Sequence, residues 1–157
     1  MVTHGIFGPH LTLDLNECNP EKLSNFDLVF DVLNDLPGKI GMTKITQPYV
    51  FKYSGLVPED KGITGFVVIA ESHISVHTFE RKNYAFIDLF SCKPFDHEYA
   101  EKFLIDAFES KKPTVNVLMR GADFPRTAEL PVSSERYSAA SKSAIDIHLA
   151  GEDVGIL

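Results

Sequence analysis

Apolar and polar positions follow their most regular pattern between residues 62 and 92 of the chain. Residues 62–70 and 84–90 are rich in Val, Ile and Phe, as buried or half-buried strands are. Between them apolar and polar residues alternate, which predicts a strand with two unlike faces. Ile74, Val76 and Thr78 lie on one face of this strand, and His73, Ser75 and His77 lie on the other. We therefore expect three consecutive strands at the centre of the fold.

Upstream of this centre, the pattern predicts a strand, a helix and a second strand. The leucines of residues 11–15 alternate with polar residues, which is typical of a half-buried strand. Asn19 and Pro20 are typical of a helix start, and the Pro-Gly pair at 37–38 of a helix end. Residues 42–54 have strand character, and the proline within them indicates an edge strand or a bulge.

Downstream of the centre, the pattern predicts one more helix and one more strand. Asp96 can cap a helix whose apolar residues recur at helical spacing as far as Phe108, and residues 114–119 predict a last strand. The order β-α-β-β-β-β-α-β predicts an α+β fold, a two-layer sandwich with a mostly antiparallel sheet and helices on one face. The other face of such a sheet needs cover, so a partner subunit is a reasonable expectation.

The length and composition of the chain predict one folded domain with a tail. The chain has 157 residues and is 44% hydrophobic, which suits a single core. Its composition changes after residue 124, where Ser, Ala and charged residues dominate. We therefore expect a domain over residues 1–124 and a C-terminal extension of unknown role over residues 125–157.

Charge and cysteine content narrow the class of protein. A net charge of −7 argues against binding to nucleic acid or to an anionic membrane. No apolar run approaches the roughly 18 residues of a membrane span, and the N-terminus lacks a signal-peptide pattern, so we expect a cytoplasmic protein. The two cysteines, Cys18 and Cys92, are too few for a disulfide framework. The scattered histidines show no zinc-ligand spacing, so we expect no metal.

Candidate chemistry gathers at the junction between the first two central strands. Ser72 follows Glu71 at this junction, His77 lies five residues further on, and Cys92 ends the next strand. A serine at such a junction is usually only a turn residue, and His and Cys are often simply packed. Their coincidence makes an active site worth considering.

The sequence of this region resembles a known enzyme family. The stretch GITGFVVIAESHISVHTF, followed by YAFIDLFSC, is similar to the prokaryotic S-adenosylmethionine decarboxylases. The segment HLTLDLNEC at 10–18 extends the resemblance upstream, and VLMRG at 117–121 extends it weakly downstream. The resemblance covers roughly residues 8–121, and its ESHISVHT core is highly specific.

The resemblance implies a pyruvoyl enzyme that makes its own cofactor. Decarboxylating an amino acid leaves a carbanion that needs an electron sink, and here the sink would be a pyruvoyl group made from Ser72 rather than pyridoxal phosphate. The chain would cleave itself between Glu71 and Ser72. By the same resemblance, His77 would remove a proton during processing, and the Thr64 hydroxyl would stabilise the processing intermediate. Cys92 would return a proton to the substrate during turnover.

The residues at the family's substrate-binding positions differ from the family pattern. Arg81 stands where the family has an acidic residue that binds the ribose, and Glu80 lies just before it. Pro58 stands where the family has an aromatic ring that stacks on adenine, and Tyr53 and Phe51 are candidates to replace that ring. The resemblance also places Glu17 near the site.

The leading hypothesis is a self-processing decarboxylase of polyamine biosynthesis. It would convert S-adenosylmethionine to its decarboxylated form and CO2 for spermidine synthesis, acting on a small amino-acid-type substrate as a homodimer of cleaved protomers. The departures at Pro58 and Arg81 keep a second hypothesis open, in which arginine or ornithine is the substrate. A third hypothesis is an uncleaved, non-catalytic homologue.

Overall fold

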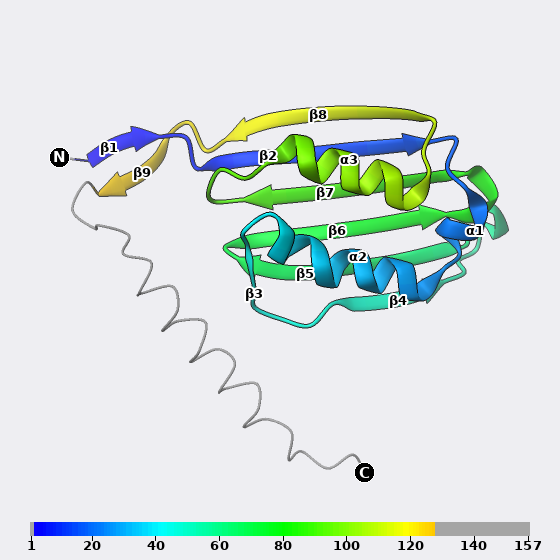
Figure 1. Cartoon of the computed structure of the whole chain (residues 1–157). Helices are drawn as coiled ribbons and strands as arrows, with labels where there is room; N and C mark the ends of the chain where they lie inside the picture. Colours follow the sequence, from blue (N-terminus) through cyan, green and yellow to red (C-terminus); the bar gives the residue numbers. More distant parts are fainter. Residues whose placement is uncertain (1, 128–157) are drawn as a thin grey trace, which may run out of the picture.

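The computed structural model of the chain describes residues 2–127, and these residues form one large antiparallel sheet with a small ribbon beside it (Figure 1). The strands of the large sheet are β2 (Gly8–Asn16), β3 (Thr43–Lys44), β4 (Tyr49–Tyr53), β5 (Gly62–Ala70), β6 (Ser72–Phe79), β7 (Tyr84–Ser91) and β8 (Lys112–Arg120). They lie in the order β3-β5-β6-β7-β2-β8, and β4 also pairs with β5. The ribbon pairs β1 (Val2–Gly5) with β9 (Phe124–Thr127).

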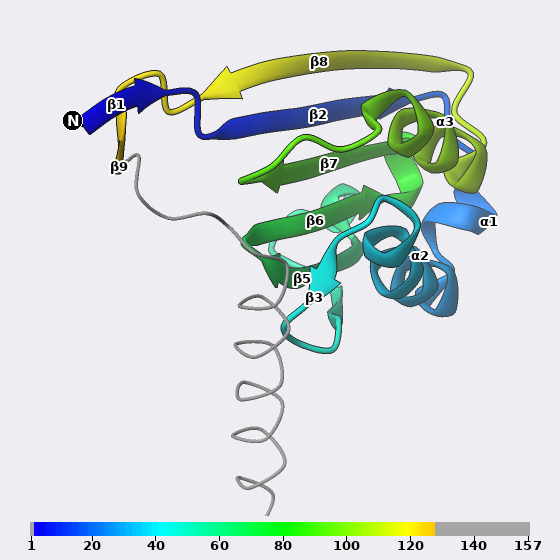
Figure 2. The same ribbon diagram turned by 60° about the vertical axis from the view of Figure 1, so that its left-hand side comes forward.

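Three helices lie on one face of the large sheet, as Figure 2 shows for the two long ones. They are α1 (Pro20–Leu23), α2 (Phe26–Lys39) and α3 (His97–Phe108). Two short 3-10 turns, η1 (Pro58–Asp60) and η2 (Glu80–Lys82), lie in loops. This arrangement confirms the predicted α+β two-layer sandwich. No helix between residues 2 and 127 combines the length and apolar character that a membrane crossing needs.

Side-chain caps explain where the helices begin. The Asn19 side chain accepts a hydrogen bond from the Glu21 N–H at 2.9 Å, and the Asp96 side chain accepts one from the Tyr99 N–H at 2.9 Å, both as predicted. The first predicted helix is divided, because Asn25 accepts from the Leu28 N–H at 3.0 Å and starts α2 separately. The predicted stop at 37–38 is wrong, since α2 includes both residues and ends at Lys39.

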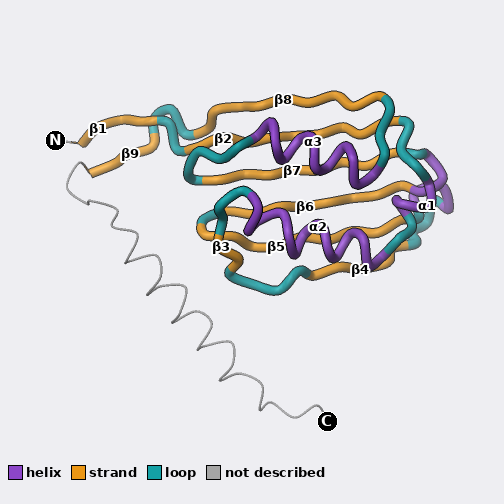
Figure 3. Tube along the Cα trace, in the orientation of Figure 1, coloured by secondary structure: helices purple, strands orange, loops and turns teal. Residues whose placement is uncertain are grey.

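The strand predicted over residues 42–54 is two strands, β3 and β4, with Pro48 in the loop between them (Figure 3). Proline has no N–H to donate to a neighbouring strand, so the ladder is interrupted there. Both pieces pair with β5, at opposite ends of it. The β1–β9 ribbon was not predicted, because its two strands lie more than a hundred residues apart and give no local signal.

The core lies between the sheet and the helices. Leu11, Leu13 and Leu15 of β2 and Ile74 and Val76 of β6 are fully buried on this side. Burying each such side chain contributes roughly 1.5–3 kcal/mol, so these alternating positions determine which face of the sheet meets the helices. The predicted two-faced pattern of residues 72–78 is therefore confirmed.

The opposite face of the sheet, which we call the open face, has no helix of residues 2–127 against it. The open face carries six large apolar side chains with exposed fractions between 40% and 57%: Tyr49, Phe51, Tyr53, Phe66, Phe86 and Leu118. An exposed apolar patch of this kind usually marks an interaction site. Residues 128–157, most of the predicted C-terminal extension, lie outside the described residues.

Candidate active site

The peptide between Glu71 and Ser72 lies at the turn from β5 to β6, held against the end of β7. The Cys92 N–H donates a hydrogen bond to the Glu71 carbonyl oxygen at 3.3 Å. The Cys92 Sγ accepts one from the Glu71 N–H at 3.4 Å. Ser72 has a φ of 145°, a conformation that residues with a side chain rarely adopt. The structure thus brings three of the predicted residues together around one strained peptide.

Close packing of the neighbouring strands fixes this end of the sheet. Ser72 pairs with Ser91 across β6 and β7. The Ser91 side chain donates to the Lys93 carbonyl at 2.9 Å, which turns the chain immediately after Cys92. Gly8 of β2 lies so near that a Cβ there would come within 1.9 Å of the Ser91 oxygen, so this close approach requires glycine.

Thr64 and His77 form a second pair, further along the sheet. They are direct cross-strand partners on β5 and β6, and the Thr64 Oγ1 lies 3.2 Å from the His77 Nδ1. Both side chains are half-buried on the open face. This hydrogen bond orients the imidazole and leaves its other nitrogen available for proton transfer.

The two pairs are separate within one chain. Ser72 and His77 lie five residues apart on the same extended strand. At about 3.3 Å per residue this is roughly 16 Å, whereas a direct proton transfer needs about 3 Å. His77 therefore does not reach Ser72 of its own chain.

The four predicted substrate-binding residues lie at the His77 end of the sheet. Tyr53 ends β4 on the open face and is 57% exposed. Glu17 is exposed in the turn after β2, at the end opposite Gly8. Glu80 and Arg81 belong to η2, which follows β6 directly. Their role in substrate binding stays a prediction, and it requires the Ser72 end and the His77 end to meet.

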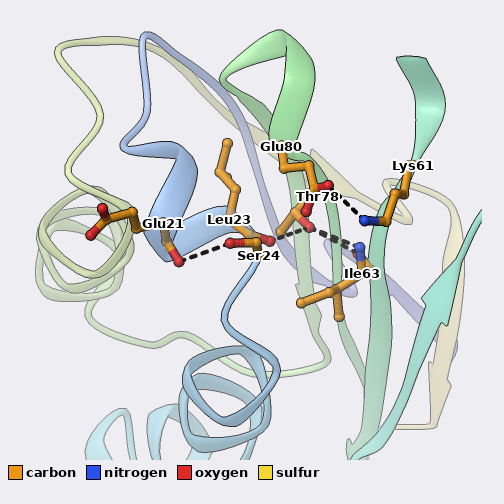
Figure 4. Close-up of polar contacts among 7 residues, drawn as sticks. All are labelled: Glu21, Leu23, Ser24, Lys61, Ile63, Thr78 and Glu80. Carbon is orange, nitrogen blue, oxygen red and sulfur yellow. Dashed lines mark hydrogen bonds and ion pairs between the residues drawn. The ribbon is translucent and has the colours of Figure 1, made fainter. Parts of the chain in front are cut away.

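The loop that holds Pro58 is anchored to η2 by two ion pairs. Glu80 pairs with Lys61 at 3.1 Å, and Figure 4 shows this pair beside Ser24, on the side of β6 that Thr78 faces. Lys82 pairs with Asp60. The Glu80 carboxylate is therefore directed toward the helix side and away from the open face.

A further cluster on the open face lies beside Ser72 and was not singled out from sequence. Phe90 pairs with His73, the residue after Ser72, and the Arg120 guanidinium lies 4.3 Å from the centre of the Phe90 ring. The His10 Nε2 lies 3.1 Å from the Asp88 Oδ1, and the His10 ring packs on Phe90. Strand alternation alone would have placed these side chains on one face, but only the strand order makes them neighbours.

The two cysteines differ in environment. Cys18 is 4% exposed and donates to the Leu15 carbonyl at 3.4 Å, and burial raises the pKa of its thiol. Cys92 is half-buried at the end of the sheet. The thiol suited to proton transfer is therefore the one beside Glu71 and Ser72.

Sequence comparisons point to one family. The family model described as S-adenosylmethionine decarboxylase matches residues 9–121. A protein of Thermodesulfovibrio yellowstonii named S-adenosylmethionine decarboxylase proenzyme is 35% identical over 125 residues, which cover 79% of this chain and 88% of that protein. A Pyrococcus furiosus protein of the same name is 32% identical over 117 residues, covering 74% of this chain and 80% of that protein.

The fold comparison agrees with the sequence comparisons. The crystal structure of the adenosylmethionine decarboxylase from Aquifex aeolicus matches with a TM-score of 0.65 and 24% identity, covering 82% of this chain and 99% of that one. The chain is thus an enzyme of the carboxy-lyase class, a pyruvoyl-dependent decarboxylase. It belongs to the S-adenosylmethionine decarboxylase family.

Proposed function

We propose that the chain cleaves itself between Glu71 and Ser72 and then decarboxylates S-adenosylmethionine, releasing CO2 and a decarboxylated product for spermidine synthesis. The observation that carries this proposal is the hydrogen bond from the Cys92 N–H to the Glu71 carbonyl oxygen at 3.3 Å. A donor at this position stabilises negative charge on that oxygen when the carbonyl is attacked. The strained Ser72 backbone favours a reaction that breaks the peptide bond.

Processing uses groups that the chain itself supplies. The Ser72 hydroxyl attacks the Glu71 carbonyl carbon, and the amide C–N bond breaks to leave an ester and a free amino group. A base removes the Ser72 α-proton, the ester C–O bond breaks, and the Glu71 carboxylate leaves. Water then hydrolyses the remaining dehydroalanine, releasing ammonia and leaving a pyruvoyl group.

Each candidate residue has one role in this scheme. The pyruvoyl group supplies the electron sink for decarboxylation. His77, oriented by Thr64 at 3.2 Å, removes the Ser72 α-proton during processing. Cys92, beside Glu71 and Ser72, returns a proton to the substrate carbon. No metal and no pyridoxal phosphate enters the scheme.

A homodimer supplies the missing contact between Ser72 and His77. Two open faces can pack at roughly 10 Å around a two-fold axis that runs across the strands near Ser75. Such an axis reverses the strand direction, so the Ser72 end of one protomer meets the His77 end of its partner. The exposed apolar side chains of the open face support this assembly.

Intact-mass spectrometry tests the cleavage. We expect two chains, residues 1–71 and residues 72–157, the second with a blocked N-terminus. The Ser72→Ala variant should give one full-length mass and no CO2 release. A full-length wild-type mass together with full activity would falsify the pyruvoyl mechanism, and a single inactive chain would indicate a non-catalytic homologue.

Complementation tests the shared site. Neither the Ser72→Ala chain nor the His77→Ala chain should mature alone. In a heterodimer of the two, one site combines the native Ser72 of the His77→Ala chain with the native His77 of the Ser72→Ala chain. Co-expression with different affinity tags should therefore yield cleaved His77→Ala chains in the doubly tagged fraction. If the purified heterodimer stays uncleaved, the base does not act across the dimer.

The choice of substrate is tested by measuring CO2 release with S-adenosylmethionine, arginine and ornithine. The relatives' names favour S-adenosylmethionine. The Glu80 carboxylate is paired with Lys61 on the helix side, so it is not free to bind the cationic tail of arginine or ornithine. We therefore expect the highest kcat/KM for S-adenosylmethionine, and a clear preference for arginine or ornithine would reject this substrate.

A further inference from the structure

Ser91 is a fully buried polar residue next to Cys92, and none of the proposed steps uses it. Its exposed fraction is 0%, whereas Cys92 is half-buried. Burying a hydroxyl is costly unless it is hydrogen-bonded, so the partners of this hydroxyl indicate what it does. Ser91 is also the cross-strand partner of Ser72, at the end of the sheet where we propose the cleavage.

The Ser91 hydroxyl closes a tight turn around Cys92. The Ser91 Oγ donates a hydrogen bond to the Lys93 carbonyl oxygen at 2.9 Å and accepts one from the Lys93 N–H at 3.2 Å. Both partners belong to the residue two positions further on, so the hydroxyl ties the backbone before Cys92 to the backbone after it. Because only Cys92 lies between the two tied residues, these bonds restrict the direction of its N–H and of its side chain.

The loop that follows α2 holds this turn in place. The Ser91 Oγ lies 3.6 Å from the Met42 Sδ, and Met42 is 5% exposed. The Lys93 ammonium donates a hydrogen bond to the Gly41 carbonyl oxygen at 3.0 Å. The turn is therefore bonded to a packed part of the chain at both of its ends, and the Cys92 backbone between them has little freedom to move.

We propose that Ser91 is a positioning residue for self-cleavage, whose hydroxyl keeps the Cys92 N–H directed at the Glu71 carbonyl oxygen. The inference rests on the proposed function, in which this N–H stabilises the carbonyl that is attacked. The contact measures 3.3 Å, just beyond the usual range of about 2.7–3.2 Å, so a small further displacement of Cys92 would end it. Ser91 acts through Cys92 and makes or breaks no bond itself.

Removing the Ser91 hydroxyl should slow self-cleavage without abolishing it. The Ser91→Ala variant keeps the Cys92 N–H and thiol but leaves the turn without its side-chain bonds. Because a misplacement of about 1 Å can cost about a hundredfold in rate, we expect cleavage to be roughly tenfold to a hundredfold slower than in wild type. Intact-mass spectrometry at timed intervals after cell-free synthesis measures this rate. Cleavage of Ser91→Ala at the wild-type rate would overturn the inference.

Two comparisons separate positioning from a general loss of stability. Ser110→Ala is the matched control, because Ser110 also donates to a backbone carbonyl, that of Asn16 at 2.7 Å, but at the end of β2 opposite Gly8. It should cleave at the wild-type rate. Ser91→Thr and Ser91→Val have nearly the same shape and differ in the hydroxyl, so only Ser91→Val should be slow. This pair decides the question if gel filtration shows that Ser91→Ala does not fold, and equal rates in the pair would overturn the inference.

Hydrogen exchange tests the inference without any cleavage. In the Ser72→Ala background, NMR measures how fast the single Cys92 amide exchanges with solvent. Because the hydrogen bond to Glu71 protects this amide, we expect Ser91→Ala to speed its exchange by about tenfold, and Ser110→Ala to leave it unchanged. The amide of Ile74, in the buried part of β6, should keep its rate in both variants, which separates a local change from global unfolding.

The outcomes distinguish this inference from the proposed function. Unchanged exchange of the Cys92 amide in Ser91→Ala overturns the positioning role. Faster exchange at Cys92 alone, together with a wild-type chain that is not cleaved, supports the positioning of Cys92 and rejects the proposed self-cleavage.

Discussion

At the scale of single residues, a backbone group and a side chain of Cys92 act on the same peptide. Its N–H polarises the Glu71 carbonyl, and its Sγ accepts the Glu71 N–H. In the proposed processing the first contact stabilises the attacked carbonyl, and it survives any substitution of Cys92 other than proline. The second depends on sulfur. Substitution of Cys92 should therefore affect turnover more than cleavage.

We predict that Cys92→Ser and Cys92→Ala are cleaved at least in part but turn over poorly. The N–H donor to Glu71 remains, whereas the thiol that we propose as the proton donor is lost. Intact-mass spectrometry measures cleavage, and repeated CO2 assays measure turnover and inactivation. Cys18→Ala is the control, because Cys18 lies in the core away from Ser72. Normal turnover in both Cys92 variants would remove this residue from the mechanism.

We predict that His77→Ala stops processing at the ester. Formation of the ester needs the Ser72 hydroxyl and the Cys92 N–H, but elimination needs a base. Hydroxylamine attacks esters, so it should cleave the purified variant into residues 1–71 and 72–157. The Ser72→Ala variant forms no ester and should resist the same treatment. If His77→Ala instead matured at the wild-type rate, another residue would be the base.

At the scale of elements, one buried hydroxyl connects β6 to β5 and α1. Thr78 is 2% exposed; its Oγ1 accepts from the Ile63 N–H at 2.9 Å and donates to the Leu23 carbonyl at 2.8 Å (Figure 4). The Leu23 carbonyl lies at the end of α1, where helix carbonyls lack intrahelical partners. Thr78 therefore fixes α1 at the His77 end of the sheet.

We predict that Thr78→Val lowers the free energy of unfolding by about 1–3 kcal/mol, because it leaves two buried backbone groups without this hydroxyl. Urea unfolding in the Ser72→Ala background, at one protein concentration, measures the effect on an uncleaved chain. Thr114→Val on the exposed edge strand is the control and should change stability by less than about 0.5 kcal/mol. Equal effects in the two variants would deny Thr78 this role.

At the scale of the whole molecule, the two faces of the sheet differ in what they carry. The helix side is a packed core, and the open face holds the candidate catalytic pair and the exposed rings. A sheet with one uncovered apolar face is an incomplete sandwich, and in the proposed dimer a second copy covers that face. The proposed dimer would both bury this face and bring Ser72 of one protomer to His77 of the other.

We predict that Phe66→Glu produces monomers that are not cleaved. Phe66 lies near the middle of the open face and is 40% exposed, so a charge there would be buried without a partner in the dimer. Tyr99→Glu is the control, since Tyr99 is a ring of similar exposure, 43%, on α3 on the other side of the sheet. Sedimentation velocity measures the assembly, and mass spectrometry measures cleavage. Cleavage in a monomeric Phe66→Glu would show that one protomer contains a complete site.

The sequence by itself determined the order of the main elements, the two faces of the central strand, and the caps at Asn19 and Asp96. These features follow from short-range periodicity and from side chains acting within a few residues. Only the tertiary structure decided which groups meet. The Cys92 N–H on the Glu71 carbonyl, the separation of His77 from Ser72, and the pairing of Glu80 with Lys61 depend on strand order and register. Contacts between residues distant in sequence are set by packing and leave no local pattern to read.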